Sequence, residues 1–267
     1  MTTNTNETIR QAVRDNYGKI AECNTPASAI IAAGSCCGTP EVGLEQLSSA
    51  LGYSREDLAT VPDGANLGLG CGNPVALGSI KPGETVIDLG SGGGFDCFLA
   101  AKKAGVTGSV IGIDMTPSMV SKARQNAEKM NSDNVEFRLG EIEHLPVADN
   151  TADIIISNCV INLSPEKDKV FREAHRVLKP GGRIAFSDIL ATAEMPENVK
   201  NDLALFSACI GGAATVEKTI ALLEQAGFRD IKIETKEESK KLINAYLPGS
   251  NAGDYIVSAY IEAKKPA

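Results

Sequence analysis

Three of the seven cysteines in this sequence stand in loops or at helix ends, where a thiol could do chemistry. Cys71 lies in GLGCGNP, Cys159 follows the apolar run ADIIIS within SNCVINLSP, and Cys209 lies in SACIGGA. A free cysteine is usually a small buried hydrophobic residue, and this plain alternative applies to each of them. If the fold brings these segments together around one ligand-binding site, however, three thiolates would bind a soft, thiophilic centre. We expect Cys97, in DCFLAA, to pack in the core instead.

A glycine-rich loop after the first apolar strand indicates a nucleoside ligand. The segment DLGSGGG (88–94) follows the strand-like run TVIDL and opens a helix, where glycines let the backbone approach a ligand closely. The dinucleotide pattern GxGxxG is not completed, because position 95 is Phe95. Asp88 would repel a pyrophosphate but would attract a cation. S-adenosylmethionine carries a sulfonium and an ammonium and no phosphate, so the loop favours this cofactor.

Further polar residues are expected at the carboxyl ends of the neighbouring strands, where open α/β sheets bind ligands. Asp114 ends the second strand and can accept both ribose hydroxyls. Glu141 follows the third strand and could accept from an adenine amino group, while Ile142 could pack on the ring. The predicted cofactor-binding residues are Asp88, Gly90, Ser91, Gly92, Gly94, Asp114, Met115, Glu141, Ile142 and Asn158.

The elements that must position these residues alternate between strand and helix from residue 84 onward. Strands are expected at 85–89, 109–114, 134–139, 152–157, 182–188, 230–235 and 254–263. Helices are expected at about 94–104, 117–130, 165–178, 196–209 and 215–226. The run KPGG (179–182) is expected to be a turn, not a phosphate site, because it ends a helix instead of starting one. This alternation predicts an α/β fold with a doubly wound, mainly parallel sheet.

The pattern divides the chain into two parts. Residues 1–80 are expected to form an N-terminal helical cap with cysteine-bearing loops, beginning with a helix at about 6–23. Residues 81–267 are expected to form the cofactor-binding domain, with a substrate-binding insertion at about 190–228.

Composition and charge exclude several classes of partner. The net charge is −8, so neither nucleic acid nor an anionic membrane is an expected partner. No apolar run reaches the length of about 18 residues that a membrane span needs. Seven cysteines without an export signal predict reduced thiols in the cytoplasm. His144 and His175, the only histidines, are expected to be structural, and no structural metal site is predicted.

Two sets of segments resemble known families. DLGSGGG, IGID, LGEIEHLPV and REAHRVLKPGGRI resemble the class I S-adenosylmethionine-dependent methyltransferases over about residues 80–190, which implies a Rossmann-like sheet of seven strands. GLGCGNP, SNCVINLSP and ACIGG together resemble the arsenite methyltransferase family over about residues 17–230. That resemblance implies methylation of trivalent arsenic bound by Cys71, Cys159 and Cys209, as part of arsenic detoxification. Longer members of that family carry an extra C-terminal domain, which is not expected within these 267 residues.

The resemblance also implies a redox role for the cysteines. A further N-terminal cysteine takes part in a relay, and Cys37 is the match we favour, with Cys36 as the alternative. Arsenite would arrive bound to small-molecule thiols and exchange onto the protein. Methyl transfer formally oxidises arsenic, and a disulfide between Cys37 and Cys71, or between Cys71 and Cys159, would return the electrons. An external thiol or a thioredoxin-like reductant would then reset the enzyme.

Two other functions stay open at this point. The chain could be a class I methyltransferase that acts on a carbon, oxygen or nitrogen acceptor, with the three cysteines as core residues. It could also be a thiol-rich arsenic-binding or redox-sensing protein without activity, although Asp88, the glycine loop and Asp114 argue against this. The number of methyl groups added, the oligomeric state and activity on other thiophilic centres are not fixed by the sequence.

Overall fold

The structure is a computed structural model that describes residues 5–23, 48–49, 51–62, 64–240 and 254–267. Seven strands form one sheet in the order β3-β2-β1-β4-β5-β7-β6. Their bounds are β1 (Thr85–Leu89), β2 (Ser109–Asp114), β3 (Val135–Leu139), β4 (Ala152–Asn158), β5 (Leu178–Ala191), β6 (Arg229–Lys236) and β7 (Ile256–Lys264). Strands β1 to β5 pair in parallel, whereas β7 runs antiparallel to both β5 and β6. The predicted doubly wound, mainly parallel α/β fold is therefore confirmed.

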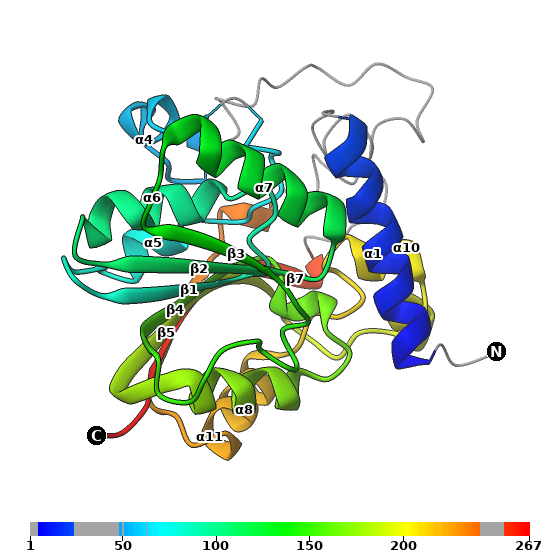
Figure 1. Ribbon diagram of the computed structural model, residues 1–267. Coiled ribbons are helices and arrows are strands. Elements are labelled where there is room, and N and C mark those ends of the chain that lie inside the picture. The colour runs from blue at the N-terminus through cyan, green and yellow to red at the C-terminus, as the bar shows by residue number, and fades with distance from the viewer. Residues whose placement is uncertain (1–4, 24–47, 50, 63, 241–253) are drawn as a thin grey trace.

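Helices cover both faces of this sheet. Figure 1 shows α6, α7 and α5 on one face and α8 and α11 on the other. The helices are α1 (Asn6–Cys23), α4 (Arg55–Ala59), α5 (Pro74–Leu77), α6 (Phe95–Ala104), α7 (Pro117–Met130), α8 (Lys167–Val177), α9 (Glu197–Lys200), α10 (Leu203–Ser207) and α11 (Val216–Gln225). No helix of the described part of the chain is long and apolar enough to cross a membrane.

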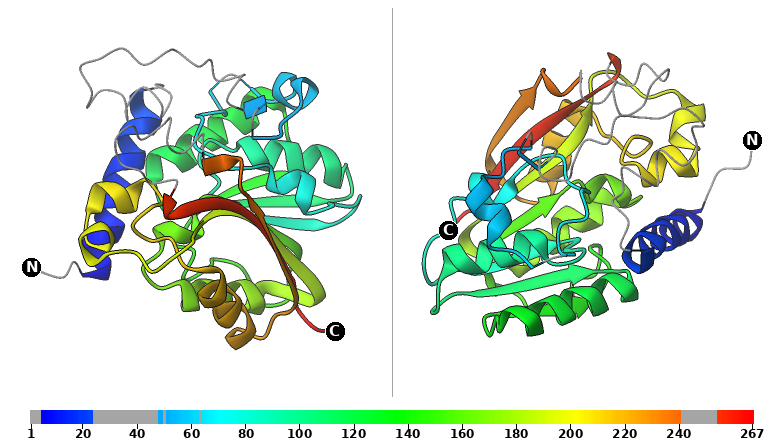
Figure 2. Two further views of the ribbon diagram at one scale, coloured as in Figure 1. Left: turned by 180° about the vertical axis from the view of Figure 1, so that it is seen from behind. Right: turned by 90° about the horizontal axis from the view of Figure 1, so that it is seen from above.

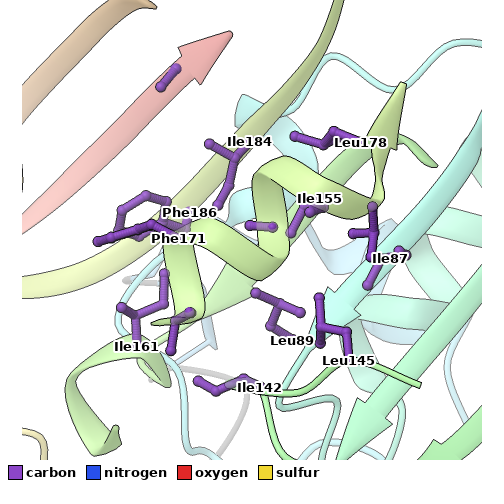
Figure 3. Close-up of a cluster of buried hydrophobic side chains, with 14 of the residues drawn as sticks. Ile87, Leu89, Ile142, Leu145, Ile155, Ile161, Phe171, Leu178, Ile184 and Phe186 are labelled. Carbon is purple, nitrogen blue, oxygen red and sulfur yellow. The ribbon is translucent and has the colours of Figure 1, made fainter. Parts of the chain in front are cut away.

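The central strands are buried on both faces, which explains their continuous apolar sequence. Successive residues point to opposite sides of a strand, so Ile155 of β4 packs toward α8 and α11 while Ile154 and Ile156 pack toward α6. The sheet thus has a hydrophobic core on each face. Figure 3 shows the core between the sheet and helices α8 and α11, which includes Phe171 and Phe186. Each such fully buried side chain contributes roughly 1.5–3 kcal/mol to folding.

Two expected elements differ from the structure. The KPGG run is not a turn between helix and strand but part of β5, where it forms a bulge: Leu178 pairs with Ala152, and Arg183 already pairs with Ile154. The single helix expected at 196–209 is divided into α9 and α10, because Asp202 caps a new helix by accepting hydrogen bonds from the backbone of residues 204 and 205.

The carboxyl ends of the parallel strands point toward α1 and α10. Figures 1 and 2 place these two helices beside each other beyond that edge of the sheet, and α1 also packs on α7. The predicted helix at 6–23 is present, and it closes over the strand ends. Residues 24–47, which belong to the predicted cap, lie outside the described residues, so the proposed boundary near residue 80 stays a prediction.

Candidate active site

A cavity opens at the carboxyl ends of β1, β2 and β4, under helix α1. Eight of the ten predicted cofactor-binding residues line it, and Gly94 and Glu141 do not. Its walls include Arg10, Val13 and Tyr17 from α1, residues 65–70, residues 90–93, and Asp88, Asp96, Asp114, Met115, Ile142, Glu143, Asn158 and Cys159. The cavity therefore joins the predicted cofactor loop to one of the predicted reactive cysteines.

The glycine loop is shaped for close approach of a ligand. Gly90 has φ +72°, and a Cβ there would lie inside van der Waals contact with the side chain of Val160. Next to it, the Ser91 hydroxyl is buried and has no hydrogen-bond partner among the described residues. Asp114 holds the loop from the next strand, because its Oδ2 accepts from the Gly92 N–H at 3.0 Å. An orphaned hydroxyl in a cradle of glycines fits a polar ligand such as the ribose or amino-acid part of S-adenosylmethionine.

Two buried carboxylates give the cavity a site for a cation. Burial and the neighbouring charge of Asp96 raise the pKa of Asp88 well above its usual value. Burial also raises the pKa of Asp96 to about 6, against the hydrogen bonds from Asn158 and Tyr53 that favour its ionised form. The Cys97 thiol donates to Asp88 Oδ2 at 3.2 Å and packs in the core, as expected. A bound sulfonium or ammonium would compensate these charges. Asp96 was missed from the sequence, although its place in the first turn after the glycine loop could have identified it.

The residue expected to contact the adenine amino group does not line the cavity. Glu141, expected to accept from the adenine amino group, is turned to α1, where its carboxylate accepts from Arg14 at 3.1 Å. Ile142 and Glu143 line the cavity in its place. Glu143 is itself buried, and it accepts from Arg10 and, at 2.6 Å, from the hydroxyl of Ser164.

The three predicted reactive cysteines lie together at the edge of this cavity. The sulfur atoms of Cys71 and Cys159 are in direct contact, and their Cα atoms are 5.9 Å apart, a separation that a disulfide can span. The Cys209 thiol donates to the backbone carbonyl of Cys159 at 2.9 Å. The surroundings are apolar, with Val13, Leu163 and Phe206 among the residues packed against the cysteines. Residues 36 and 37, one of which was predicted as a relay cysteine, lie outside the described residues.

The backbone at two of these cysteines is in an uncommon conformation. Cys159 has φ +57° and Cys209 has φ +64°, in the left-handed region that L residues with a Cβ rarely adopt. Such positions persist only where the surrounding structure enforces them, and they cluster at functional sites. The strain therefore supports a role for these residues beyond packing.

Charged groups around the thiols were not foreseen from the sequence. The ligand atoms of Asp188, Cys71 and Cys159 lie within 4.8 Å of one another. Burial raises the pKa of Asp188 to about 6, opposed by backbone hydrogen bonds and by Lys167. Burial also lowers the pKa of Lys167 to about 8. The pKa of Cys209 is raised by burial first and by the charge of Asp188 second, while Tyr17 and Lys167 act in the opposite direction.

Comparisons with known proteins agree with this geometry. A family model described as a methyltransferase domain matches residues 80–239. An arsenite methyltransferase from Halobacterium salinarum is 50% identical over 98% of this chain and 68% of its own length. One from Aquipseudomonas alcaligenes is 36% identical over 84% of this chain and 63% of its own length. A solved arsenic(III) S-adenosylmethionine methyltransferase from Chlamydomonas reinhardtii superposes with a TM-score of 0.61 and 32% identity, covering 83% of this chain and 73% of that one. The chain thus spans about two thirds of the length of these two curated relatives.

Proposed function

Because the chain belongs to the arsenite methyltransferase family of S-adenosylmethionine-dependent enzymes, we propose that it methylates trivalent arsenic held by Cys71, Cys159 and Cys209. One observation supports this acceptor above all. Cys71, Cys159 and Cys209 are separated by 88 and 50 residues in the sequence, yet they gather beside the cofactor cavity: the Cα atoms of Cys71 and Cys159 are 5.9 Å apart, and Cys209 bonds the carbonyl of Cys159.

The residues of the cavity fit S-adenosylmethionine. Ser91 offers a buried, unpartnered hydroxyl, and Asp88 and Asp96 offer carboxyl groups whose ionised form a bound cationic group would stabilise. When bound, the cofactor supplies an electrophilic methyl group on a sulfonium. The lone pair of trivalent arsenic is the nucleophile, so the protein needs no general base at the acceptor.

The thiols carry the substrate. Arsenic enters by exchange: each protein sulfur forms a bond to arsenic as a small-molecule thiolate leaves, and the proton of the protein thiol passes to that leaving thiolate. The buried Cys209 thiol keeps its proton at neutral pH because burial and Asp188 raise its pKa, so its bond to arsenic must form together with proton loss. The apolar contacts of Val13, Leu163 and Phe206 exclude water from the arsenic–sulfur bonds.

Two electrons must be returned after the transfer, because methylation formally raises arsenic from +3 to +5. Two arsenic-bound thiolates supply them when their two arsenic–sulfur bonds break and the sulfur atoms join as a disulfide, which returns arsenic to the +3 state. The 5.9 Å between the Cα atoms of Cys71 and Cys159 favours this pair, and Cys37 with Cys71 is the alternative. A thioredoxin-like protein or a small thiol would then reduce the disulfide.

The direct test is to incubate the reduced protein with S-adenosylmethionine, arsenite and glutathione and to speciate arsenic by chromatography with mass detection. Wild type and a Cys23→Ser control are expected to form methylated arsenic, whereas Cys71→Ser, Cys159→Ser and Cys209→Ser are expected to lose it. Absence of methylated arsenic from wild type that binds S-adenosylmethionine would exclude arsenic as the acceptor.

A further inference from the structure

The side chain of Asn158, the last residue of β4, joins the two cysteines that are in contact. Its Oδ1 accepts from the backbone N–H of Cys71 at 2.9 Å. Its Nδ2 donates to the backbone carbonyl of Gly72 at 2.9 Å. One amide thus binds the chain on both sides of the Cys71–Gly72 peptide link, while the next residue in its own strand is Cys159.

The orientation of this amide is fixed by its other partners. Nδ2 also donates to Tyr53 Oη at 2.9 Å and to Asp96 Oδ2 at 3.0 Å. Tyr53 in turn donates to Asp96 Oδ1 at 2.7 Å, which makes a closed network in the interior. A flipped amide would place its NH₂ against the Cys71 N–H and its oxygen against a carboxylate and a carbonyl, so only the present orientation matches donors to acceptors, with the two N–H bonds of Nδ2 shared among three acceptors.

The segment that carries Cys71 packs directly against the side-chain amide of Asn158. A Cβ at Gly70 would lie 2.6 Å from Asn158 Nδ2, so glycine is the only residue that leaves the amide undisturbed. Residues 68–73 form no helix or strand. Their position therefore depends on such side-chain contacts, and not on a backbone ladder.

We infer that Asn158 is a positioning residue for the dithiol site. Besides lining the cofactor cavity, as its sequence position had suggested, it sets Cys71 against Cys159. This inference rests on the proposed function, because the dithiol matters only if the cysteines bind a thiophilic substrate. It adds a residue whose role is to keep two thiols, brought from separate elements, beside each other.

Phenylarsine oxide provides a test that does not require catalysis, because it condenses with two neighbouring thiols and releases one water. Its binding to the reduced full chain is measured by titration, and the bridged peptides are identified by mass spectrometry. Asn158→Ala is expected to weaken bridging of Cys71 and Cys159 about tenfold, as loss of two hydrogen bonds to the segment implies. The affinity for S-adenosylhomocysteine is expected to fall too, because Asn158 lines the cavity and bonds Asp96, but by a smaller factor than bridging.

Asn134→Ala is the matched control. Asn134 also donates from its side chain to backbone carbonyls, of Ala101 and Gly105, but at the far end of α6. A residue that only stabilises the fold would give the same pattern in both variants. Equal bridging in Asn158→Ala and Asn134→Ala, or an equal loss of cofactor affinity and bridging in Asn158→Ala, would overturn the inference.

Gly70→Ala disturbs the same contact from the other side. The single variant is expected to weaken bridging, because its new methyl group displaces the amide. The double variant Gly70→Ala/Asn158→Ala is expected to bridge no worse than Asn158→Ala, since the displaced atoms are gone, whereas additive losses would contradict the inference. If wild type itself does not bridge Cys71 and Cys159, the proposed function fails; if wild type bridges and Asn158→Ala does so equally well, only the positioning role fails.

Discussion

Single residues show how much negative charge the candidate site keeps away from water. Asp88, Asp96 and Asp188 are all buried, and burial raises the pKa of each one. Asp88 and Asp96 face the cavity predicted for a cation, whereas Asp188 faces the thiols. Because a buried carboxylate without a cation is unfavourable, we expect this part of the molecule to be less stable in the absence of ligands than its packing alone would suggest.

The pH dependence of stability follows from the sign of these shifts. Burial raises the pKa of Asp188 in the folded state to about 6, so its contribution to stability is fully present below pH 4 and is lost as pH rises through 6. The free energy of unfolding of wild type is expected to decrease between pH 4 and pH 7. In Asp188→Asn this decrease should be smaller than in wild type by up to ~3 kcal/mol. Urea denaturation followed by circular dichroism at both pH values measures it.

An exposed variant, Asp168→Asn, gives the effect of removing an acidic side chain as such. Comparing each protein with itself at two pH values cancels any cost of the new amide that does not depend on pH. Equal pH dependence in wild type and Asp188→Asn would show that Asp188 does not titrate in this range.

Gly90 offers a second test on a single residue, which concerns stability and cofactor binding. Gly90→Ala combines a positive φ with a clash against Val160, whereas Gly181→Ala has a similar φ of +77° and no atom within 4 Å of the new Cβ. We expect Gly181→Ala to cost about 1 kcal/mol of stability and Gly90→Ala about 2 kcal/mol more. Only Gly90→Ala should also weaken binding of S-adenosylhomocysteine, measured by calorimetry. Equal behaviour of the two variants would mean that Val160 moves aside freely.

The site residues that could be predicted from the sequence are those that stand at a recognisable position directly after a predicted strand. The glycine loop and Asp114 follow strands in a recognisable order, and Cys159 directly follows β4. Asp188 and Lys167 gave no such signal, because their importance comes from burial beside the thiols, which depends on the packing of β5 and α8. Glu141 was assigned to adenine by its place after β3; its pairing with two arginines of α1 gave no local signal, and its contact with adenine stays a prediction.

Among the elements, helix α1 joins the N-terminal segment to the cofactor cavity. Arg10, on its inner face, lies in contact with Glu166 and 3.3 Å from Glu143, and both carboxylates belong to the segments around β3 and α8. Val13 and Tyr17, on the same face, line the cavity. The helix itself was predictable from the spacing of its apolar residues, but its contact with the strand ends was not, because ion pairs between distant segments leave no periodic pattern.

Arg10→Ala should therefore affect both stability and cofactor binding. Its loss leaves Glu143 buried without its cation, which costs roughly 3 kcal/mol, and releases one wall of the cavity. Arg172→Ala is the matched control, since its pair with Asp168 is exposed and contributes less than ~1 kcal/mol. Chemical denaturation and calorimetry with S-adenosylhomocysteine measure the two effects. An unchanged affinity in Arg10→Ala would separate α1 from cofactor binding.

At the scale of the whole molecule, the cavity is built by segments from the N-terminal helix to β4, so cofactor binding and global folding must be coupled. S-adenosylhomocysteine at 100 times its dissociation constant should raise the free energy of unfolding by ~2.7 kcal/mol. Circular dichroism in urea is the suitable measurement, because the chain has no tryptophan. A smaller gain at that saturation would show that the ligand also binds the unfolded chain.

The architecture was largely predictable, because buried parallel strands require continuous apolar runs and the helices that cover them require apolar residues at helical spacing. The expected strands correspond to those of the sheet, and the family assignment is confirmed. The bulge at KPGG and the division of the helix at 196–209 were not foreseen. The first depends on which residues of β5 pair with β4, and the second on the hydrogen bonds by which Asp202 caps α10. The placement of β7 between β5 and β6 likewise follows from pairing across the sheet and not from chain order.

That placement of β7 has a consequence for biosynthesis. Within the described sheet β6 pairs only with β7, and Lys264, the end of β7, follows Lys236, the end of β6, by 28 residues. The end of β7 also follows the end of β5 by 73 residues, so at translation rates of about 5–20 residues per second β5 presents an open edge to other nascent chains for roughly 4–15 s. Cys71, Cys159 and Cys209 have all been synthesised by then. The thiols that must later meet are thus exposed to oxidation and mispairing before the sheet that holds them is complete, and a holdase chaperone would be most useful in this interval.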